Sequence, residues 1–280
     1  MTWGTLYVVG TPLGHLGDLS QRAAEVLRTV TLVAAEDTRR TRKLLGRLGA
    51  RPKVLSYHAH SNPRREADLV DALRGGTDVA LVTDAGTPGI SDPGRTLVEA
   101  VRTAGGPTVP IPGPSAVTAA LSVSGMSADR YLFLGFLPRK GRDRARLLEA
   151  VATSPWSVVL FEAPGRLADL LGDLGRRLAA GRRVLVAREL TKVHEELRDG
   201  TVEEQLSYWS EREPRGEVTV VIEGLRGEPA PAHRADPDAA RELATELLGD
   251  GLSARDIARM VAERTGLPRN EAYRLVTDLT

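Results

Sequence analysis

The chain has 280 residues, of which 41% are hydrophobic, so it is long enough to bury two cores or one large one. It contains no cysteine, which excludes disulfide bonds and thiolate metal sites, and its formal net charge of +1 argues against nucleic-acid binding over the whole surface. No apolar stretch reaches bilayer length and no basic segment precedes the first apolar run, so we expect a cytoplasmic protein with no membrane partner.

The first 112 residues repeat a unit of strand, loop and helix. Short apolar runs rich in β-branched residues predict strands at 6–9, 31–35, 54–56, 79–82 and near 109. Helices are predicted between them, at 18–28, 38–48, from Asn62-Pro63 onward, and at 93–103 with Asp92 as its N-cap. Such alternation predicts an α/β lobe with a mainly parallel sheet and helices on both faces.

A second α/β lobe is expected over residues 113–225, after a proline-rich interruption at 110–114. Its predicted strands are 131–134, 158–161, 184–187 and 218–222, and its predicted helices are 115–123, 145–152, 167–178 and 202–208. Residues 226–237 are rich in proline, alanine, glycine and charge, which predicts a linker. Residues 238–280 predict a small helical unit similar to a helix-turn-helix, including helices at 253–265 and 268–279.

Three loops of small residues follow predicted strands, at 10–14, 83–94 and 110–116. The segment 83–91 contains two glycines, a proline, two threonines, a serine and an aspartate, and glycine lets a ligand approach the backbone closely. The carboxyl ends of parallel strands meet at one edge of a sheet, where α/β proteins bind ligands. The 10–14 loop has neither a GxGxxG nor a Walker sequence, so the three loops predict a ligand site without predicting a nucleotide-phosphate site.

Ordered motifs along nearly the whole chain carry a family resemblance. The segments are 6–14, 34–39 with Arg42, 81–94, 112–116, 161–167, 188–192 with Glu195, and 215–217. In these segments the chain resembles the tetrapyrrole methylase superfamily, and within it the cytidine 2′-O-methyltransferases that act on the decoding region of small-subunit (16S) ribosomal RNA. The resemblance implies a two-lobed α/β fold, S-adenosyl-L-methionine as methyl donor held between the lobes, a homodimer, and 16S rRNA or the small ribosomal subunit as partner.

The same correspondence implies a set of cofactor-binding residues. They are Leu13, Gly86, Thr87, Pro88, Ile90, Ser115 and Ala116, with Glu162 and Leu190 nearby. Thr87 stands where the superfamily usually has an aspartate, a change that removes a carboxylate but keeps backbone contacts. Asp84 either faces the positive charge of the cofactor or caps the loop, and the sequence favours neither.

A basic segment indicates how RNA is bound. Residues 38–51 contain six cations and no acidic residue: Arg39, Arg40, Arg42, Lys43, Arg47 and Arg51. Such a helix suits contacts to phosphates, although a solvated helix face explains the same pattern. A second basic segment, 139–146, is placed to border the other side of the site.

The chemistry of methyl transfer narrows the catalytic residues. A sulfonium loses a neutral thioether, so little acid catalysis is needed, whereas a ribose hydroxyl needs positioning and a base that takes its proton late. We hypothesise that Asp37, Arg39, Glu189 and Lys192 act in the reaction, because polar pairs at strand ends are hard to explain by packing. Each of them alone is also explained as a structural ion pair or a helix cap. Glu36, His58 and Glu162 are further candidate bases.

Two features leave alternatives open. His58 and His60 form a His-x-His pair with no third ligand nearby, so we expect hydrogen bonding or RNA contact there and no metal. The terminal helical unit carries several arginines and suits an auxiliary RNA clamp or a packing appendage.

Two other functions compete with RNA methylation. A methyltransferase acting on a precorrin-like tetrapyrrole would share the cofactor loops but leaves the basic helix unexplained. A DNA-binding protein that senses a ligand would use the terminal unit and transfer no methyl group.

Overall fold

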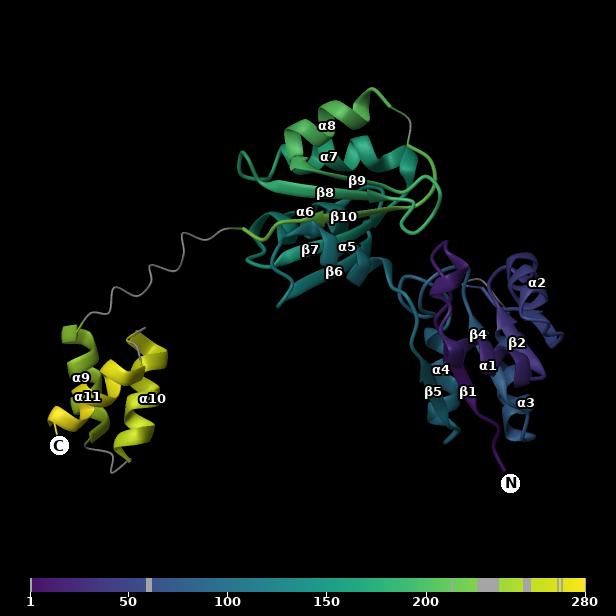
Figure 1. Ribbon diagram of the computed structural model, residues 1–280, viewed down its shortest axis with the longest axis horizontal. Helices are drawn as coiled ribbons and strands as arrows, with labels where there is room; N and C mark the ends of the chain where they lie inside the picture. Colours follow the sequence, from purple (N-terminus) through teal and green to yellow (C-terminus); the bar gives the residue numbers. More distant parts are fainter. Residues whose placement is uncertain are drawn as a thin grey trace. The chain divides into compact units, whose positions relative to one another are not determined.

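The structure is a computed structural model that describes residues 2–58, 62–212, 214–225, 237–248, 253–265, 267 and 269–279 (Figure 1). The chain divides into two compact units, Met1–Leu225 and Arg226–Thr280. The predicted linker lies outside the described residues except for Pro237, which begins a helix. Among the residues described, no helix has the length and apolar character needed to cross a bilayer.

Five parallel strands form the first sheet, in the order β3-β2-β4-β1-β5. They are β1 (Leu6–Val9), β2 (Leu32–Ala35), β3 (Lys53–Ser56), β4 (Val79–Val82) and β5 (Thr108–Ile111). Every residue of β2 and β4 is buried, as expected for interior strands of a sheet covered on both faces. The predicted parallel sheet is therefore confirmed.

Four helices cover the two faces of this sheet. They are α1 (Gln21–Thr29), α2 (Thr38–Arg47), α3 (Pro63–Arg74) and α4 (Arg95–Thr103). On one face α1 and α2 pack through Leu27 and Leu45, and on the other α3 and α4 pack through Leu69 and Leu97. Side-chain caps fix where three of these helices begin, because Ser20, Asp37 and Asn62 accept hydrogen bonds from their first-turn amides.

The loops at the carboxyl edge of this sheet are joined to one another. Thr11 and Gly86 exchange backbone hydrogen bonds of 2.8 and 3.0 Å, which join the loops after β1 and β4. The loops after β1 and β5 meet at Gly10 and Gly113, where a Cβ on Gly113 would lie 2.8 Å from the carbonyl carbon of Gly10. Glycine at both positions therefore allows three strand-end loops to gather at one place.

The second sheet is mixed, in the order β6-β7-β10-β8-β9, with only β6 and β7 parallel. Its strands are β6 (Tyr131–Phe136), β7 (Ser157–Glu162), β8 (Arg183–Arg188), β9 (Glu196–Thr201) and β10 (Val218–Ile222). One face is covered by α6 (Arg142–Thr153), α7 (Leu167–Gly175) and α8 (Val202–Ser210), and the other by α5 (Ala116–Ser124). The sequence did not predict β9.

The second unit is a bundle of short helices, drawn in yellow-green and yellow in Figure 1: α9 (Pro237–Leu248), α10 (Ala254–Thr265) and α11 (Arg269–Leu279). Ile257, Val261 and Val276 are fully buried in a core that also includes Ala240 and Ala244 of α9. The apolar residues of α10 and α11 thus form a core that they share with α9. The predicted α/β fold with a helical C-terminal unit is confirmed.

Candidate active site

A cavity of about 440 Å³ opens at the carboxyl edge of the first sheet. Residues after β1, β2 and β4 line it, together with the start of α5 and the residues around the end of β7 and the start of β10. Its volume is that of an ordinary small-molecule site. The three small-residue loops predicted to form a ligand site therefore share one cavity.

Most of the predicted cofactor residues line this cavity: Leu13, Asp84, Gly86, Thr87, Ile90, Ser115, Ala116 and Glu162. Two of the predicted residues do not. Pro88 lines a separate cavity of about 370 Å³ beside β1 and α4, and Leu190 packs in the core under α5. Their roles toward a cofactor stay predictions.

The loop after β4 has a backbone that needs its small residues. Gly86, Gly89 and Ser91 have positive φ angles of 77°, 84° and 60°. The hydroxyl of Thr11 donates to the carbonyl of Thr83 at 3.0 Å, which fixes the beginning of the loop. Left-handed backbone at these points turns the chain sharply within the loop, and Gly86, Thr87, Ile90 and Ser91 of this loop line the cavity.

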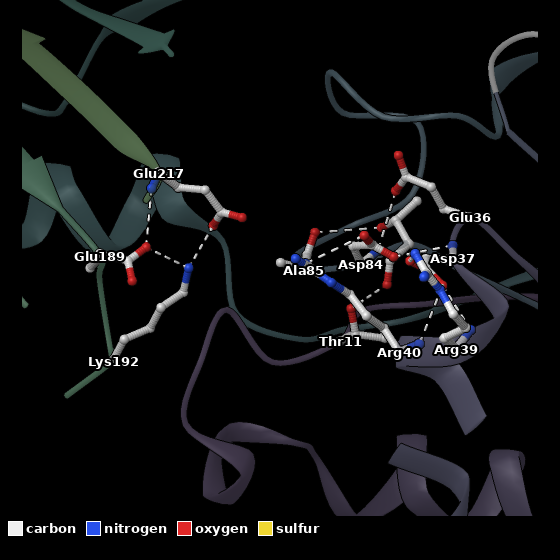
Figure 2. A network of polar contacts seen from close by, with 11 residues as sticks. Thr11, Glu36, Asp37, Arg39, Arg40, Asp84, Ala85, Glu189, Lys192 and Glu217 are labelled. Carbon is white, nitrogen blue, oxygen red and sulfur yellow. Dashed lines mark hydrogen bonds and ion pairs between the residues drawn. The ribbon is translucent and has the colours of Figure 1, made fainter. Parts of the chain in front are cut away.

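Carboxylates hold the ends of β2 and β4 together beside the cavity (Figure 2). The amide of Asp84 donates to Glu36 Oε2 and the amide of Asp37 donates to Asp84 Oδ1, both at 3.2 Å. Arg40 Nη1 lies 3.4 Å from Asp84 Oδ2. Glu36, Arg40 and Asp84 all line the cavity. The Asp84 carboxylate binds the Asp37 amide and Arg40, and its role toward a cofactor stays a prediction.

Asp92 also lines the cavity and was assigned a different role from the sequence. The Asp92-Pro93 pair predicted the N-cap of α4, but α4 begins at Arg95, and its N-cap is Gly94 with a φ of 139° and no side-chain cap. The prediction was wrong because the loop continues two residues further than the Asp-Pro signal suggests. Burial and the nearby charge of Glu36 raise the pKa of Asp92 to about 7.

The first predicted catalytic pair, Asp37 and Arg39, is engaged at the start of α2. The Asp37 carboxylate accepts from the amide of Arg39 at 2.7 Å and pairs with Arg39 Nη2 at 3.1 Å. These hydrogen bonds from Arg39 lower the pKa of Asp37 to about 2. Neither residue lines the cavity, whereas their neighbours Glu36 and Arg40 do.

The second predicted pair, Glu189 and Lys192, forms a network with Glu217 (Figure 2). Lys192 Nζ lies 2.7 Å from Glu189 Oε1 and 3.2 Å from Glu217 Oε2, and the Glu217 amide donates to Glu189 Oε1 at 3.1 Å. Burial acts to raise the pKa of Glu189, but the hydrogen bonds from Lys192 and the Glu217 amide lower it below its usual range. Of the three residues, Glu217 lines the cavity.

Glu162 ends β7 with a fully buried side chain. Its Oε1 accepts from the Ala163 amide at 2.8 Å and pairs with Arg166 Nε at 3.1 Å. Its Oε2 has no hydrogen-bond partner among the described residues, although the residue lines the cavity. Burial raises the pKa of this carboxyl. A buried acceptor without a partner is costly, so this oxygen suits a donor supplied by a ligand.

Several lining residues were given no role in the site from the sequence. Phe136 and Phe161 pack with ring centroids 5.7 Å apart, and Phe136 is 53% exposed. Glu217 and Thr219 come from the start of β10, at the opposite end of the second lobe's sequence from Phe136. An aromatic residue at a strand end, shortly before a proline, was the available signal for Phe136.

No metal was expected at the His58–His60 pair, and the structure describes only one of these two histidines. His58 is described, whereas His60 lies outside the described residues. Within the described ranges, no group of three or more histidines and carboxylates is arranged to hold a metal ion.

Comparisons with known proteins agree with this arrangement. Residues 5–205 match the family described as Tetrapyrrole (Corrin/Porphyrin) Methylases, and residues 234–280 match the RsmI C-terminal HTH domain. The chain is 44% identical over 276 residues to Ribosomal RNA small subunit methyltransferase I of Synechocystis sp., covering 99% of this chain and 98% of that protein. It is 41% identical over 275 residues to the protein of the same name from Escherichia coli O157:H7, covering 97% and 94%.

A solved structure shares the fold of the first unit. Uroporphyrin-III C-methyl transferase from Thermus thermophilus, complexed with S-adenyl homocysteine, gives a TM-score of 0.59 at 19% identity and covers 79% of this chain and 97% of its own. The chain belongs to the tetrapyrrole methylase family.

Proposed function

We propose that this protein transfers a methyl group from S-adenosyl-L-methionine to the ribose 2′-oxygen of a cytidine in the decoding region of 16S rRNA. The observation that carries the proposal is similarity along both units to proteins named Ribosomal RNA small subunit methyltransferase I. A precorrin-like substrate would not account for the match of residues 234–280 to the RsmI C-terminal domain.

The residues that line the 440 Å³ cavity fit the methyl donor. Residues 84–87 and 115–116 border the space for a folded ligand, and apolar surface is available at Ile90, Phe136 and Phe161. The carboxylate of Asp84 suits the positive charges of such a ligand, and the unpartnered Glu162 oxygen suits an amino or hydroxyl donor. We therefore place the cofactor in this cavity.

For this reaction the protein must mainly position the two reactants and accept one proton. When bound, S-adenosyl-L-methionine supplies an electrophilic methyl group on a sulfonium. The bond from the 2′-oxygen to the methyl carbon forms as the sulfur–carbon bond breaks, and the hydroxyl proton must leave. Asp92 lines the cavity with a pKa of about 7, which suits a base working near neutral pH. We assign Asp92 as the group that takes this proton.

The four catalytic residues predicted from the sequence, Asp37, Arg39, Glu189 and Lys192, do not line the cavity themselves, but they hold residues that do. Asp37 and Arg39 fix the start of α2 and thereby the placement of Glu36 and Arg40. Glu189 and Lys192 fix Glu217 at the cavity. We propose that all four are positioning residues for the reaction.

The partner and location follow from the same proposal. The substrate is 16S rRNA, free or within the small subunit, so the protein works in the cytoplasm. We further propose that it acts as a homodimer.

The helical unit is expected to contribute RNA affinity. A chain that ends at Leu225 removes one compact unit with its own core and leaves both sheets intact. We expect this truncation to raise the Kd for small-subunit RNA by about tenfold or more, because it removes the unit that matches the RsmI C-terminal HTH domain. The Kd for the cofactor, measured by calorimetry, is expected to stay unchanged. A loss of cofactor affinity would instead assign the unit a structural role.

Substrate class is tested by supplying labelled methyl donor with four separate acceptors. They are small-subunit RNA, assembled small subunits, duplex DNA and precorrin. We expect label in RNA or in small subunits. Label only in tetrapyrrole would overturn the proposal, and tight binding to DNA without any transfer would indicate a ligand-sensing regulator.

A further inference from the structure

A second cavity, of about 260 Å³, lies between the loop after β1 and helix α2. Every residue that lines it comes from the lobe of the first sheet. Pro12, Leu13, Leu16 and Leu44 give it apolar surface, and Arg40, Lys43 and Arg47 supply positive charge. The function proposed above places no ligand here.

The cations of this cavity share one face of α2. Arg40, Lys43, Leu44 and Arg47 are spaced i, i+3, i+4 and i+7, which brings them onto one side of a helix. Arg40 pairs with Asp84, but Lys43 and Arg47 make no ion pair with any carboxylate in the described part of the chain. Two cations beside apolar surface, with no internal counter-ion, favour an anionic ligand that also has an apolar part.

The two cavities share part of their lining. Leu13, Arg40 and Asp84 border both the 260 Å³ and the 440 Å³ cavities. A group held in the smaller cavity therefore lies next to the space assigned to the methyl donor. A methyl acceptor must lie directly beside the methyl donor, and a ligand of the smaller cavity meets this requirement.

We propose that the smaller cavity binds the target nucleotide turned out of the RNA, with its base against Leu16 and Leu44 and its flanking phosphates at Lys43 and Arg47. Its ribose then lies at Leu13, where the two cavities meet, so that the 2′-oxygen faces the larger cavity that Asp92 lines. This rests on the proposed function, since it names where that substrate binds. Single-stranded RNA is commonly recognised in this way, by unstacked bases on apolar or aromatic surface and by cations on the backbone. Arg40 and Asp84 pair with each other and line both cavities, so they are placed to position the ribose where the nucleotide meets the cofactor.

The test compares two double variants that remove the same charge. Lys43→Ala with Arg47→Ala empties the cavity of its unpaired cations. Arg22→Ala with Lys53→Ala removes one arginine and one lysine from exposed positions of the same lobe that line neither cavity. Methyl transfer to unmethylated small subunits is measured for both and for the wild type, as KM and kcat across a range of salt concentrations, with the cofactor Kd measured by calorimetry.

We expect the cavity variant to raise KM for small subunits by about tenfold for each phosphate left without its cation, with the cofactor Kd unchanged. The surface variant should change KM less than about twofold, because exposed charges at a distance are screened. Equal KM values for the two variants would overturn the proposal and leave only general attraction to RNA. Absence of transfer by the wild type would instead refute the proposed function.

A cross-linking experiment locates the nucleotide directly. Small-subunit RNA carrying 5-iodocytidine at the methylated position is irradiated with the full-length wild-type protein, and the attached peptide is sequenced. We expect attachment within residues 11–16 or 38–47. Attachment only to residues of the second sheet's lobe would place the nucleotide elsewhere and overturn the proposal.

Discussion

Gly113→Ala is expected to weaken cofactor binding by at least about tenfold, because displacement of the two loops by about an ångström misplaces the groups that position a ligand. The added Cβ would lie 2.8 Å from the carbonyl carbon and oxygen of Gly10, a contact so short that one of the two backbones must shift. The loops after β1 and β5 must therefore separate, and they carry Leu13 and Ser115 of the cavity. Overpacking of this kind also lowers the free energy of unfolding by about 1–3 kcal/mol.

The matched control for this variant is Gly175→Ala. Gly175 ends α7, has no positive φ, and a Cβ there would meet no atom within 4 Å. We expect it to leave the cofactor Kd unchanged and to alter the free energy of unfolding by less than about 1 kcal/mol. Calorimetric titration with the cofactor and denaturant unfolding measure both effects. Wild-type affinity in Gly113→Ala would show that the packing of these loops against each other does not set the geometry of the site.

Asp92→Asn is expected to reduce kcat by about 10²–10⁴-fold, the usual contribution of a general base. In the wild type, kcat should rise with pH through about 7 as Asp92 loses its proton. The variant should show no such rise. If it keeps wild-type kcat with the same pH profile, Asp92 is not the proton acceptor.

The same substitution has an opposite effect on stability, which separates a catalytic role from loss of fold. The pKa of Asp92 is raised from 3.8 to about 7 in the folded state, so the folded protein holds this proton more tightly than the unfolded chain does. This tighter binding stabilises the folded protein. The stabilisation is complete below about pH 4 and is lost as the pH rises to about 7. For a half-buried group the loss should amount to about 1–2 kcal/mol.

We therefore expect Asp92→Asn to be more stable than the wild type at pH 8, with the difference shrinking toward pH 4. Urea unfolding of both proteins at the two pH values measures this difference. Equal stability at pH 8 would mean that burial does not raise the pKa of Asp92 in the folded protein.

Much of the fold followed from the sequence because local and long-range signals agreed. The strands of the first sheet are short apolar runs between capped helices, and parallel alternation leaves few ways to arrange them. Strand β9 was missed because its sequence, Glu196–Thr201, has three charged residues, a glycine and a single large apolar residue, Leu197, and so lacks an apolar β-rich run. It is an edge strand that pairs with β8, and the residues of β9 alone do not predict this pairing.

The site was predictable to the level of loops but not of side-chain direction. Residues 36 and 37 follow the same strand, yet Glu36 lines the cavity while Asp37 turns to the amides of α2. Neighbouring residues of an extended segment point to opposite sides, so a position at a strand end does not tell which of two adjacent carboxylates faces the ligand. Likewise, the sequence does not tell that Arg40 lines the smaller cavity whereas its neighbour Arg39 pairs with Asp37.

The proposed function requires the product to be a ribose methyl ether in small-subunit RNA. Alkali cleaves an RNA linkage only when the adjoining 2′-oxygen is free to attack the phosphate, so methylation protects one linkage. After wild-type protein acts on unmethylated small subunits with S-adenosyl-L-methionine, we predict that one linkage 3′ to a cytidine in the decoding region resists alkaline cleavage. Cleavage at every linkage, despite methyl label in the RNA, would place the methyl group on a base and contradict the account.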